Sequence, residues 1–549
     1  KTRKTQSTAK VPFPAPDVST RVVPVPTEGG DAISPLAAMD PKRAPILDNW
    51  VPRTGWVELR QGYAPFSILG ALPVETIAVY RPAAGSEQMF AASGPDIYAV
   101  AAGPGVPVGT GLTSARWQYL NYTPAGATSV IQLVNGADLL QMYDGASWTT
   151  PSITGLPGSA TTADIIGIAA YGRRIWYVLN DSTTVAYMPT DAIMGPIAGT
   201  LDFGALWSKG GFLVAMADWT VDGGEGPQDY AVFMSSRGQV SVFAGLDPTN
   251  ASVWTLVGTF SVAPPLGRRC LYPIGSDVAI ITQQGVLPLS QVLPFDPSAD
   301  RSVALTSRIQ NAMATAAAQS GSNFGWQLIS FPAQALAVLN VPVTENSQQQ
   351  QFVMNALTGA WCRFLNWNAN CFEIFDDALY FGDNLGNVNL AYSGGLDLNV
   401  PIYSDMQCAF NYFDDPGRVK RMTMVQPLLV ASGVVTPTMS VDEDFSNNAP
   451  SAPVTVIGPG ASATWDASKW DVAVWPQPSQ PVVQWLSVQA IGHALAVRMQ
   501  VNASQVAVSD LGEFDIALFD SAVFDAGAGG APVLQINAFN SIIEMGGYI

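Results

Sequence analysis

Charged residues are scarce in this sequence, and basic residues are the scarcer kind. Asp, Glu, Lys and Arg make up 12% of the 549 residues, against about 25% in an average soluble domain. Lysine occurs seven times, and the formal net charge is −18. Tight binding of nucleic acid needs several Lys or Arg side chains that replace the counterions of the phosphates. The composition therefore argues against specific nucleic-acid binding.

Histidine is nearly absent, which removes whole classes of active site. His493 is the single histidine, so most metal sites with two or more His ligands are excluded and one candidate is left for a Ser-His-Asp or Cys-His site. Alternate residues from His493 to Met499 are apolar, which predicts a strand with His493 on the apolar face. The motifs G-x-S-x-G, G-x-x-x-x-G-K-[ST] and H-E-x-x-H do not occur. We expect no enzyme activity, no cofactor and no metal.

Cysteine is also rare. Cys270, Cys362, Cys371 and Cys408 form no C-x-x-C pair. Cys362 and Cys371 flank a predicted turn at 366–370 and could face each other across a hairpin. Plain buried thiols are the main expectation, and a Cys362–Cys371 bridge is the alternative.

Long apolar runs are missing. No stretch of 18 or more apolar residues occurs, so no transmembrane helix is expected. Residues 1–10 lack an apolar core, so no signal peptide is predicted there.

Acidic residues gather in two short segments. Asp222, Glu225 and Asp229 lie in a Gly-rich loop, and 442–444 is an Asp-Glu-Asp run. Solvated loops are the main expectation and weak calcium sites the alternative. A pair of carboxylates for glycoside hydrolysis stays open at this stage.

Turn formers and aromatic residues are abundant instead, which is typical of an all-β protein. Hairpins are predicted over 231–243, 278–289 and 378–390, with Gly238, Gly285 and Gly386 at their turns. These glycines are 47 and 101 residues apart, and Trp148, Trp254 and Trp361 are 106 and 107 apart. The intervals fit one and two units of about 50 residues, the length of a four-stranded propeller blade. Residues 65–400 would then hold about six or seven blades of a β-propeller.

The remaining segments are assigned around this propeller. Residues 1–64 are predicted to be an extended arm and entry segment, because nine prolines in the first 60 residues disfavour helix and central strand. A helical insertion is predicted over 301–319, capped by Asp300 and stopped by Gly321, with its Ala-rich face either packed on a neighbour or lying at the surface.

Residues 401–549 are predicted to form a β-sandwich or jelly-roll, with strands at 422–430, 482–490 and 494–501. Aromatic residues recur every five positions in the boxes 465–475 and 514–525, each followed by Asp. We interpret both boxes as stacked short arches with the aromatic side chains inside.

Four residues in the entry segment are candidates for docking to a partner. Trp50, Arg53, Trp56 and Arg60 lie in one short stretch, and Trp and Arg commonly anchor interfaces. The alternative is that this stretch closes the core of its own subunit. The first 60 residues carry a net charge of +3 and the rest −21, so the distal arm, 1–40, is expected to reach an acidic neighbouring subunit or adaptor. Deleting 1–40 should then leave a folded body that assembles poorly.

Several of these segments resemble the tail hub or nozzle proteins of short-tailed bacteriophages (podoviruses), including those called packaged-DNA stabilisation proteins. The similar segments are 39–62 (MDPKRAPILDNWVPRTGWVELRQG), the hairpin 278–290, the pair 352–361 and 379–386, and the Trp-Asp and Phe-Asp boxes. The resemblance implies a structural virion protein that is assembled in the host cytoplasm. Such a protein forms a ring, typically a hexamer, below the portal and the head-to-tail adaptor. The ring extends the DNA-ejection channel, docks fibres or spikes, and lets double-stranded DNA pass without specific binding.

The acidity of the body allows two interpretations. It would suit a channel that must not retain DNA, or it would serve solubility alone. The competing function is a glycan-binding or glycan-cleaving β-propeller of a phage tailspike, because propellers host many activities. A bacterial surface adhesin is a third, less favoured interpretation.

Overall fold

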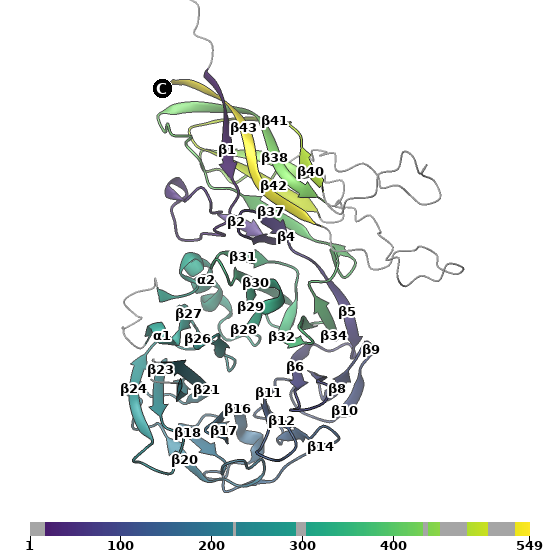
Figure 1. Cartoon of the computed structure of the whole chain (residues 1–549), viewed down its shortest axis with the longest axis vertical. Coiled ribbons are helices and arrows are strands. Elements are labelled where there is room, and N and C mark those ends of the chain that lie inside the picture. The colour runs from purple at the N-terminus through teal and green to yellow at the C-terminus, as the bar shows by residue number, and fades with distance from the viewer. Residues whose placement is uncertain are drawn as a thin grey trace, which may run out of the picture.

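The computed structural model describes residues 17–222, 227–292, 303–431, 437–450, 480–502 and 533–548. Regular structure in these residues is almost entirely strand, so the protein is mainly β. A ring of small sheets forms one part of the molecule, and a pair of longer sheets lies on one side of the ring (Figure 1).

Seven antiparallel sheets make up the ring in the described part of the chain. The first three are β6 (Val74–Tyr80), β7 (Gln88–Ser93), β8 (Asp96–Val100) and β10 (Val106–Gly109); β11 (Gln118–Tyr122), β12 (Val130–Val134), β13 (Gln141–Tyr143) and β14 (Trp148–Thr149); and β16 (Ile165–Tyr171), β17 (Arg174–Leu179), β18 (Thr184–Tyr187) and β20 (Gly199–Asp202). The fourth and fifth are β21 (Leu213–Asp222), β22 (Pro227–Ser235), β23 (Gln239–Ala244) and β24 (Thr255–Ser261); and β25 (Leu271–Ile274), β26 (Asp277–Thr282) and β27 (Gly285–Pro288). The last two are β28 (Gln327–Phe331), β29 (Leu336–Thr344), β30 (Gln348–Asn355) and β31 (Trp361–Phe364); and β32 (Ala369–Phe375), β33 (Ala378–Asp383), β34 (Asn387–Ala391) and β5 (Tyr63–Ile68).

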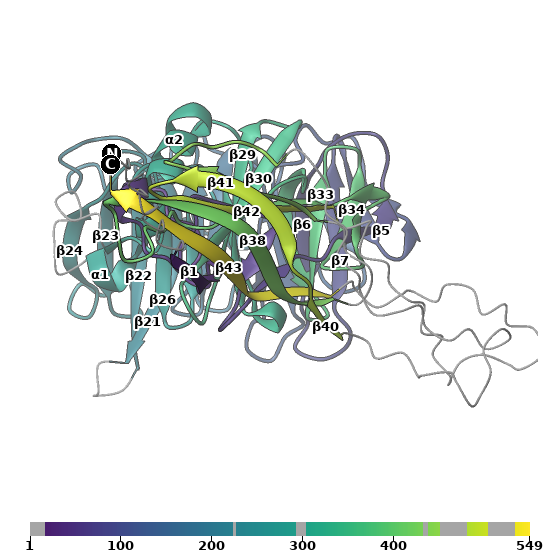
Figure 2. The same ribbon diagram turned by 90° about the horizontal axis from the view of Figure 1, so that it is seen from above.

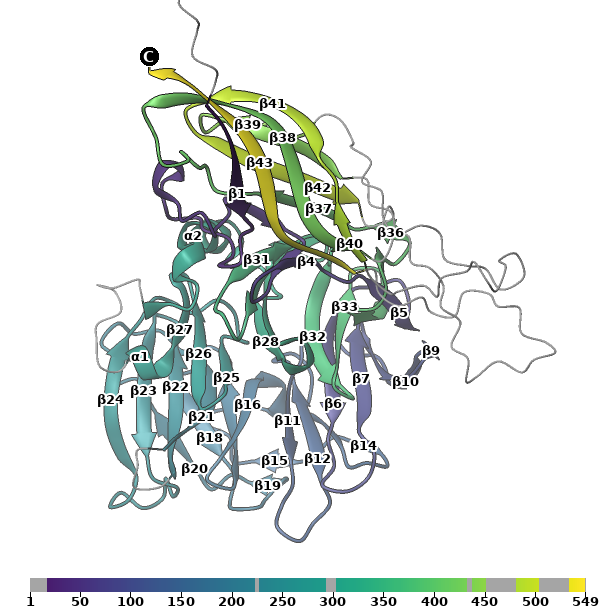
Figure 3. The same cartoon turned by 45° about the horizontal axis from the view of Figure 1, so that its top comes forward.

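The ring is closed by a strand from far away in the sequence. The first strands of the seven sheets contact one another in chain order, and β32 of the last sheet contacts β6 of the first. β5 completes the last sheet by pairing with β34, so a strand that precedes β6 joins the end of the ring to its beginning. The arrangement is propeller-like, as the sequence predicts (Figure 3).

The sequence repeat matches equivalent positions in these sheets. All three predicted hairpins are confirmed: Gly238 and Gly386 lie between the second and third strands of their sheets, and Gly285 begins the third strand of its sheet. Gly238 has a φ of 79°, and a Cβ there would lie 2.3 Å from the carbonyl oxygen of Val262. Trp148, Trp254 and Trp361 lie at or just before the fourth strand of the second, fourth and sixth sheets.

The sixth sheet continues beyond the ring. After β31 come β2 (Ile46–Asp48), β37 (Tyr403–Gln407), β42 (Leu495–Asn502) and β39 (Thr438–Glu443), which gives one sheet of eight strands. A seven-stranded sheet packs against this extension; its strands are β1 (Asp17–Pro24), β3 (Trp50–Pro52), β4 (Val57–Leu59), β38 (Arg418–Ala431), β40 (Gln480–Val483), β41 (Leu486–Gly492) and β43 (Leu534–Tyr548). In Figure 2, which looks from above, the long strands of this layer lie in front of the ring. One apolar core joins both sheets to the ring; it includes Val425, Met499, Phe539, Phe364 and Trp367.

The N-terminal segment differs from the expected arm. β1 pairs with β43 along its whole length, and β2 lies between β31 and β37, so the expectation of no central strand in this segment is wrong. The prolines do not interfere because Pro24 and Pro52 end their strands and Pro45 precedes β2. These pairings cross the expected boundaries at 64/65 and 400/401.

The predicted helical insertion is shorter than expected. Helix α2 (Gln310–Ser320) follows a 3₁₀ turn at Ser307–Ile309, and it is the longest helix in the described residues. The start at 301 is wrong, because the chain before the turn bonds to β27. The Leu305 N–H donates to the Val286 carbonyl, and the Val286 N–H donates to Thr306 Oγ1 at 3.1 Å. Met313, Ala316 and Ala317 are buried in the core shared with β29, so the Ala-rich face packs on a neighbour. The expected cap, Asp300, lies outside the described residues.

The predicted strands near the C-terminal end are present with altered bounds. The segment 422–430 lies within β38, and 494–501 lies almost entirely within β42. The segment 482–490 divides into β40 and β41, with a break at 484–485. The aromatic boxes 465–475 and 514–525 lie outside the described residues.

Candidate binding site at the mouth of the ring

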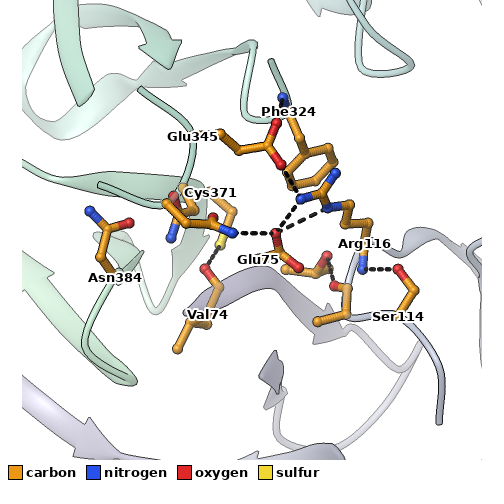
Figure 4. Close-up of polar contacts among 12 residues, drawn as sticks. Val74, Glu75, Ser114, Arg116, Phe324, Glu345, Cys371 and Asn384 are labelled. Atoms are coloured by element: carbon orange, nitrogen blue, oxygen red, sulfur yellow. Dashed lines mark hydrogen bonds and ion pairs between the residues drawn. The ribbon is translucent and has the colours of Figure 1, made fainter. Parts of the chain in front are cut away.

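Charged side chains from four sheets of the ring meet at one end of its axis. Glu75 is the second residue of β6, Arg116 precedes β11, Arg269 precedes β25 and Phe324 precedes β28, while Glu345 lies in the turn from β29 to β30. We call these five residues the mouth cluster. Figure 4 shows Arg116 pointing toward Glu75 and Glu345, with Phe324 beside its guanidinium.

Arg116 connects the two carboxylates of the mouth cluster. Its Nε donates to Glu75 Oε1 at 3.0 Å, and its Nη2 donates to Glu345 Oε1. The guanidinium also lies over the Phe324 ring, 4.6 Å from the ring centroid. The Phe324 N–H donates to the second Glu345 oxygen at 3.0 Å. The first, second and sixth sheets are therefore tied together at this point.

Arg269 reaches across the ring axis. Its Nη2 lies within 3.2 Å of three oxygens, which belong to the Glu75 carbonyl, the Thr76 hydroxyl and the Trp117 carbonyl. These oxygens belong to the first and second sheets. Arg269 precedes β25 of the fifth sheet, and the fifth sheet is a neighbour of neither the first sheet nor the second. Its guanidinium also lies 4.9 Å from the Phe324 centroid. Side chains thus close the axis at this end.

The environment sets the charge states of this cluster. Burial raises the pKa of Glu345, but hydrogen bonds from Phe324 and Arg116 outweigh it, so the pKa lies below the ordinary value of 4.5. Burial lowers the pKa of Arg269 below its ordinary value. Glu345 is therefore ionised at neutral pH and is a poor proton donor.

A second group of polar side chains connects the same strands farther along the axis. Arg81 Nη2 donates to Glu373 Oε1 at 3.0 Å, and the Tyr119 hydroxyl donates to the other Glu373 oxygen. Burial raises the pKa of Glu373 above its ordinary value, and hydrogen bonds from Tyr119 and Arg81 oppose that rise. This group links the seventh, first and second sheets, which are neighbours in the ring. The bonds of Arg269 across the axis leave no passage for a nucleic-acid duplex through the ring of one chain.

Two of the four predicted docking residues are interior. Trp50 is fully buried in the core shared by the ring and the paired sheets. Arg60 is 1% exposed, and it binds both oxygens of Asp397 at 2.8 and 2.7 Å. For these two residues the alternative is confirmed, because they close the core of their own chain.

Arg53 and Trp56 lie nearer the surface. Arg53 Nε donates to Glu58 Oε1 at 2.7 Å, and its Nη1 donates to the Gln334 carbonyl of the sixth sheet at 2.7 Å. The Trp56 indole donates to Glu58 Oε2 at 3.1 Å. Both side chains are half-buried, and their docking role stays a prediction.

His493 does not lie within a strand, although the sequence predicts one there. It lies in the turn from β41 to β42 with its side chain 44% exposed, because Asp444 accepts the backbone N–H groups of His493 and Ala494 and fixes that turn. Asp442 is buried and accepts from Gln407, while Glu443 accepts the Ile491 N–H at 2.6 Å. Thr220 donates to Asp229 at 2.7 Å, and Glu225 lies outside the described residues. No group of three or more His, Cys, Asp or Glu that could hold a metal occurs in the part of the chain that the structure describes.

The four cysteines are buried free thiols, so the Cys362–Cys371 bridge is not formed. Burial raises the pKa of Cys371 to about 12, and its Sγ donates to the Val74 carbonyl at 3.6 Å (Figure 4). Thiols of this kind are unreactive.

Sequence analysis missed the mouth cluster. A usable signal was present, because Arg116 and the pair Arg268–Arg269 each directly precede a strand in a chain of only 25 basic residues. Their convergence depends on ring closure, which no local pattern reveals.

Comparisons with known proteins give no family for this chain. No family model matches the sequence, and no curated relative matches it. Among solved structures, the BBS1N chain of its complex with ARL6DN is 10% identical, with a TM-score of 0.37, over 62% of this chain and 97% of that one. Chaetomium thermophilum Raptor is 9% identical, with a TM-score of 0.37, over 60% and 28%. The extracellular domain of the hybrid two-component system BT4673 from B. thetaiotaomicron is 11% identical, with a TM-score of 0.39, over 60% and 39%. Similarities this weak indicate nothing about function.

None of the helices in the described ranges is long and apolar enough to cross a membrane.

Proposed function

We propose that this protein is a structural component of a short phage tail, of the nozzle or hub type. Copies of the chain would form a ring, taken to be a hexamer, below the portal and adaptor. This ring would extend the channel through which DNA leaves and would carry fibres or spikes. The proposal begins from the sequence resemblance, and the following features of the structure support it.

The observation that carries the proposal is the eight-stranded sheet. Backbone hydrogen bonds run without a gap from β28 in the ring to β39 in the paired sheets. The two parts also share one core. Domains are expected to move relative to each other unless their interface is large and apolar. A continuous sheet and a shared apolar core therefore suit a component that transmits force rather than one that opens and closes.

The closed ring axis is consistent with this function. Arg269 of the mouth cluster crosses the axis of a single chain. A DNA channel would therefore lie between copies, lined by surfaces of several chains. A net charge of −18 per copy would weaken any hold on DNA passing nearby.

At finer detail, we propose that the ring is a seven-bladed β-propeller in which β5 closes the last blade. The paired sheets would form a β-sandwich built from both ends of the chain. The sequence predicts an arm followed by two independent domains. We propose one interlocked body instead.

The proposal is tested by imaging the purified protein in negative stain and by labelling tails of the parent virion with an antibody raised against it. Rings of one size, and label at the tail below the portal, are expected. Monomers at micromolar concentration together with unlabelled tails would contradict the proposal. Release of reducing sugar from host envelope polysaccharide would instead favour the glycan-cleaving alternative.

A further inference from the structure

The outermost strand of the fourth sheet is open to pairing. β24 lies at the end of the order β21-β22-β23-β24, and no strand pairs with its outer edge in the residues that the structure describes. Seven residues long, it reads TLVGTFS and contains neither a charged residue nor a proline. Natural proteins rarely leave such an edge unprotected, because it can pair with other chains.

The other outer edges of the ring are blocked in recognisable ways. β10 contains Pro107, β14 has two residues, β20 ends at Asp202, and β27 ends at Pro288 and leads into α1 (Leu289–Val292). The sixth sheet continues into β2, and in the seventh sheet β5 pairs further with β9 (Gly103–Pro104) and β35 (Leu396–Asp397). β24 has none of these blocks in the described chain; it carries a β-bulge at Val257, and its last four residues, 258–261, pair regularly with β23.

The surface beside this edge is apolar. Leu256 and Val257 on β24 are 42% and 51% exposed, and Leu246 and Val253 in the preceding loop are exposed as well. Exposed apolar side chains are therefore present both on β24 and in the loop that leads into it. A partner strand would cover them while it satisfies the free backbone groups.

The fourth sheet as a whole is acidic. Residues 213–261 contain five acidic residues and one basic residue, a net charge of −4. Asp229 on β22 is exposed and lies two strands, or about 10 Å, from β24. That separation is close to the screening length at ordinary salt, so the field of the sheet is felt at its edge.

One segment of the same sequence has the complementary chemistry. Residues 1–16, which precede β1, carry four basic residues and no acidic residue, a net charge of +4. The first ten, KTRKTQSTAK, contain no proline or glycine and include three threonines, which favour strands. Fully extended, sixteen residues span up to about 55 Å.

We propose that residues 1–10 of one copy add to the β24 edge of a neighbouring copy as an extra strand. A neighbour is favoured over the same chain because of where β1 begins. The Asp17 end of β1 lies at the far end of the paired sheets, whereas β24 lies on the outer rim of the ring (Figure 1). A contact of this type is head-to-tail and repeats from copy to copy, so it closes into a ring when the rotation permits.

This inference rests on the proposed function, because both require copies of the chain to assemble into rings. The inference can be wrong while the proposed function is right. The closing experiment therefore measures the contact on a single body that lacks residues 1–16. The shortened chain keeps all of β1 from Asp17, including Val23 in the shared core.

The experiment is binding of a fluorescent peptide of residues 1–16 to this shortened chain, followed by anisotropy. We expect saturable binding that weakens as salt rises, and protection of the backbone amides of 255–261 from hydrogen exchange. Val257→Lys should weaken binding at least roughly tenfold by like-charge repulsion, while Val257→Glu should not weaken it. The matched control is Val106→Lys, a change at an exposed valine on the blocked edge of β10, which should leave binding unchanged.

A charge exchange separates edge pairing from general attraction to an acidic protein. A peptide with K1E, R3E, K4E and K10E should bind the Val257→Lys body more tightly than the unmodified body. Equal binding to the unmodified, Val257→Lys and Val106→Lys bodies, or no protection of 255–261, would overturn the inference. In full-length chains, rings that form normally with Val257→Lys would overturn it as well while leaving the proposed function in place.

Discussion

Single residues connect the ring to the paired sheets, and Arg60 is the central one. Its five N–H groups are all used: two by Asp397, and one each by Asn49 Oδ1, the Gln61 carbonyl and the Leu365 carbonyl. The guanidinium also lies 5.5 Å from the ring centroid of Phe364 and 5.2 Å from that of Trp367. A charge this deep is tolerated only because it is paired and fully hydrogen-bonded.

We predict that Arg60→Ala lowers the free energy of unfolding by about 3–5 kcal/mol, because it leaves Asp397 buried without a partner. Urea denaturation followed by tryptophan fluorescence measures this. Arg173→Ala is the matched control: that arginine is 64% exposed in its pair with Asp191, and its loss should cost under about 1 kcal/mol. The double change Arg60→Met with Asp397→Leu should cost less than Arg60→Ala alone. Equal losses for Arg60→Ala and Arg173→Ala would contradict a buried pair.

Asp138 gives a prediction about pH. It accepts the N–H groups of Thr113 and Ser114 and the side-chain amide of Asn135. Burial raises its pKa, but these hydrogen bonds outweigh burial, so the folded pKa lies below the ordinary 3.8. A carboxyl with a lowered folded pKa stabilises the fold above the unfolded pKa, and that stability is lost as pH falls through the folded pKa. Asp138→Asn should therefore cost about 1 kcal/mol at pH 7, and the difference from the unmodified protein should shrink below pH 3.8.

Urea midpoints at pH 7, 5.5 and 3 measure this difference. Asp218→Asn is the control, because Asp218 is exposed on β21, and it should change nothing at any of the three pH values. If the stability difference caused by Asp138→Asn grows on acidification, the folded state does not lower the pKa of Asp138, and the prediction is wrong.

At the scale of elements, local hairpins could be predicted and distant pairings could not. The hairpins around Gly238, Gly285 and Gly386 follow from turn glycines between apolar runs, and each partner lies within a few residues. β1 pairs with β43 between residues more than 500 positions apart, and neither segment carries a pattern that identifies the other. Proline content suggested an arm because composition does not show that prolines lie at strand ends.

The mouth cluster and the docking residues show the same division. Trp and Arg anchor interfaces, which suggested docking for Trp50 and Arg60, but only the fold decides whether such residues face a partner or a core, and both are buried. The helix start was missed for a similar reason, since the hydrogen bonds of Leu305 and Thr306 with Val286 depend on where β27 lies.

β1 changes which deletion tests the N-terminal segment. Val23 and Val25 are buried in the shared core, so removing 1–40 would damage the body rather than leave it folded. We predict that deleting 1–16 leaves the unfolding midpoint unchanged. Deleting 1–24 should lower the free energy of unfolding by at least about 2 kcal/mol, because β1 and its buried valine are lost.

A pair of substitutions in β1 gives the matched test. Val23→Ala, at a side chain 2% exposed, should cost about 2 kcal/mol. Val22→Ala, at a neighbour 60% exposed, should cost almost nothing. Equal effects of the two changes would mean that β1 does not pack against the core as described.

At the scale of the whole molecule, strands from the first 70 residues close both parts. β5 completes the ring, while β1 to β4 complete the paired sheets and join them to the sixth sheet of the ring. The protein is therefore one interlocked body, and the ring cannot close before residues from both ends of its sequence have met. Such a body should unfold as a unit even though its length suggests several domains.

We predict one calorimetric transition for the unmodified protein, with the calorimetric enthalpy close to the van't Hoff enthalpy. Leu47→Pro should convert it into two transitions. Leu47 is buried in β2, opposite Met406 of β37, where a proline removes a backbone donor from the bridge between the ring and the paired sheets. Leu36→Pro is the control, since Leu36 begins a 3₁₀ turn after the extended Pro35, a position that accepts proline, and it should retain one transition. Two transitions in the unmodified protein, or one in Leu47→Pro at an unchanged temperature, would show that β2 does not couple the two parts. The proposal that the chain transmits force would then lose its structural basis, because force on the paired sheets would reach the ring only through side-chain contacts.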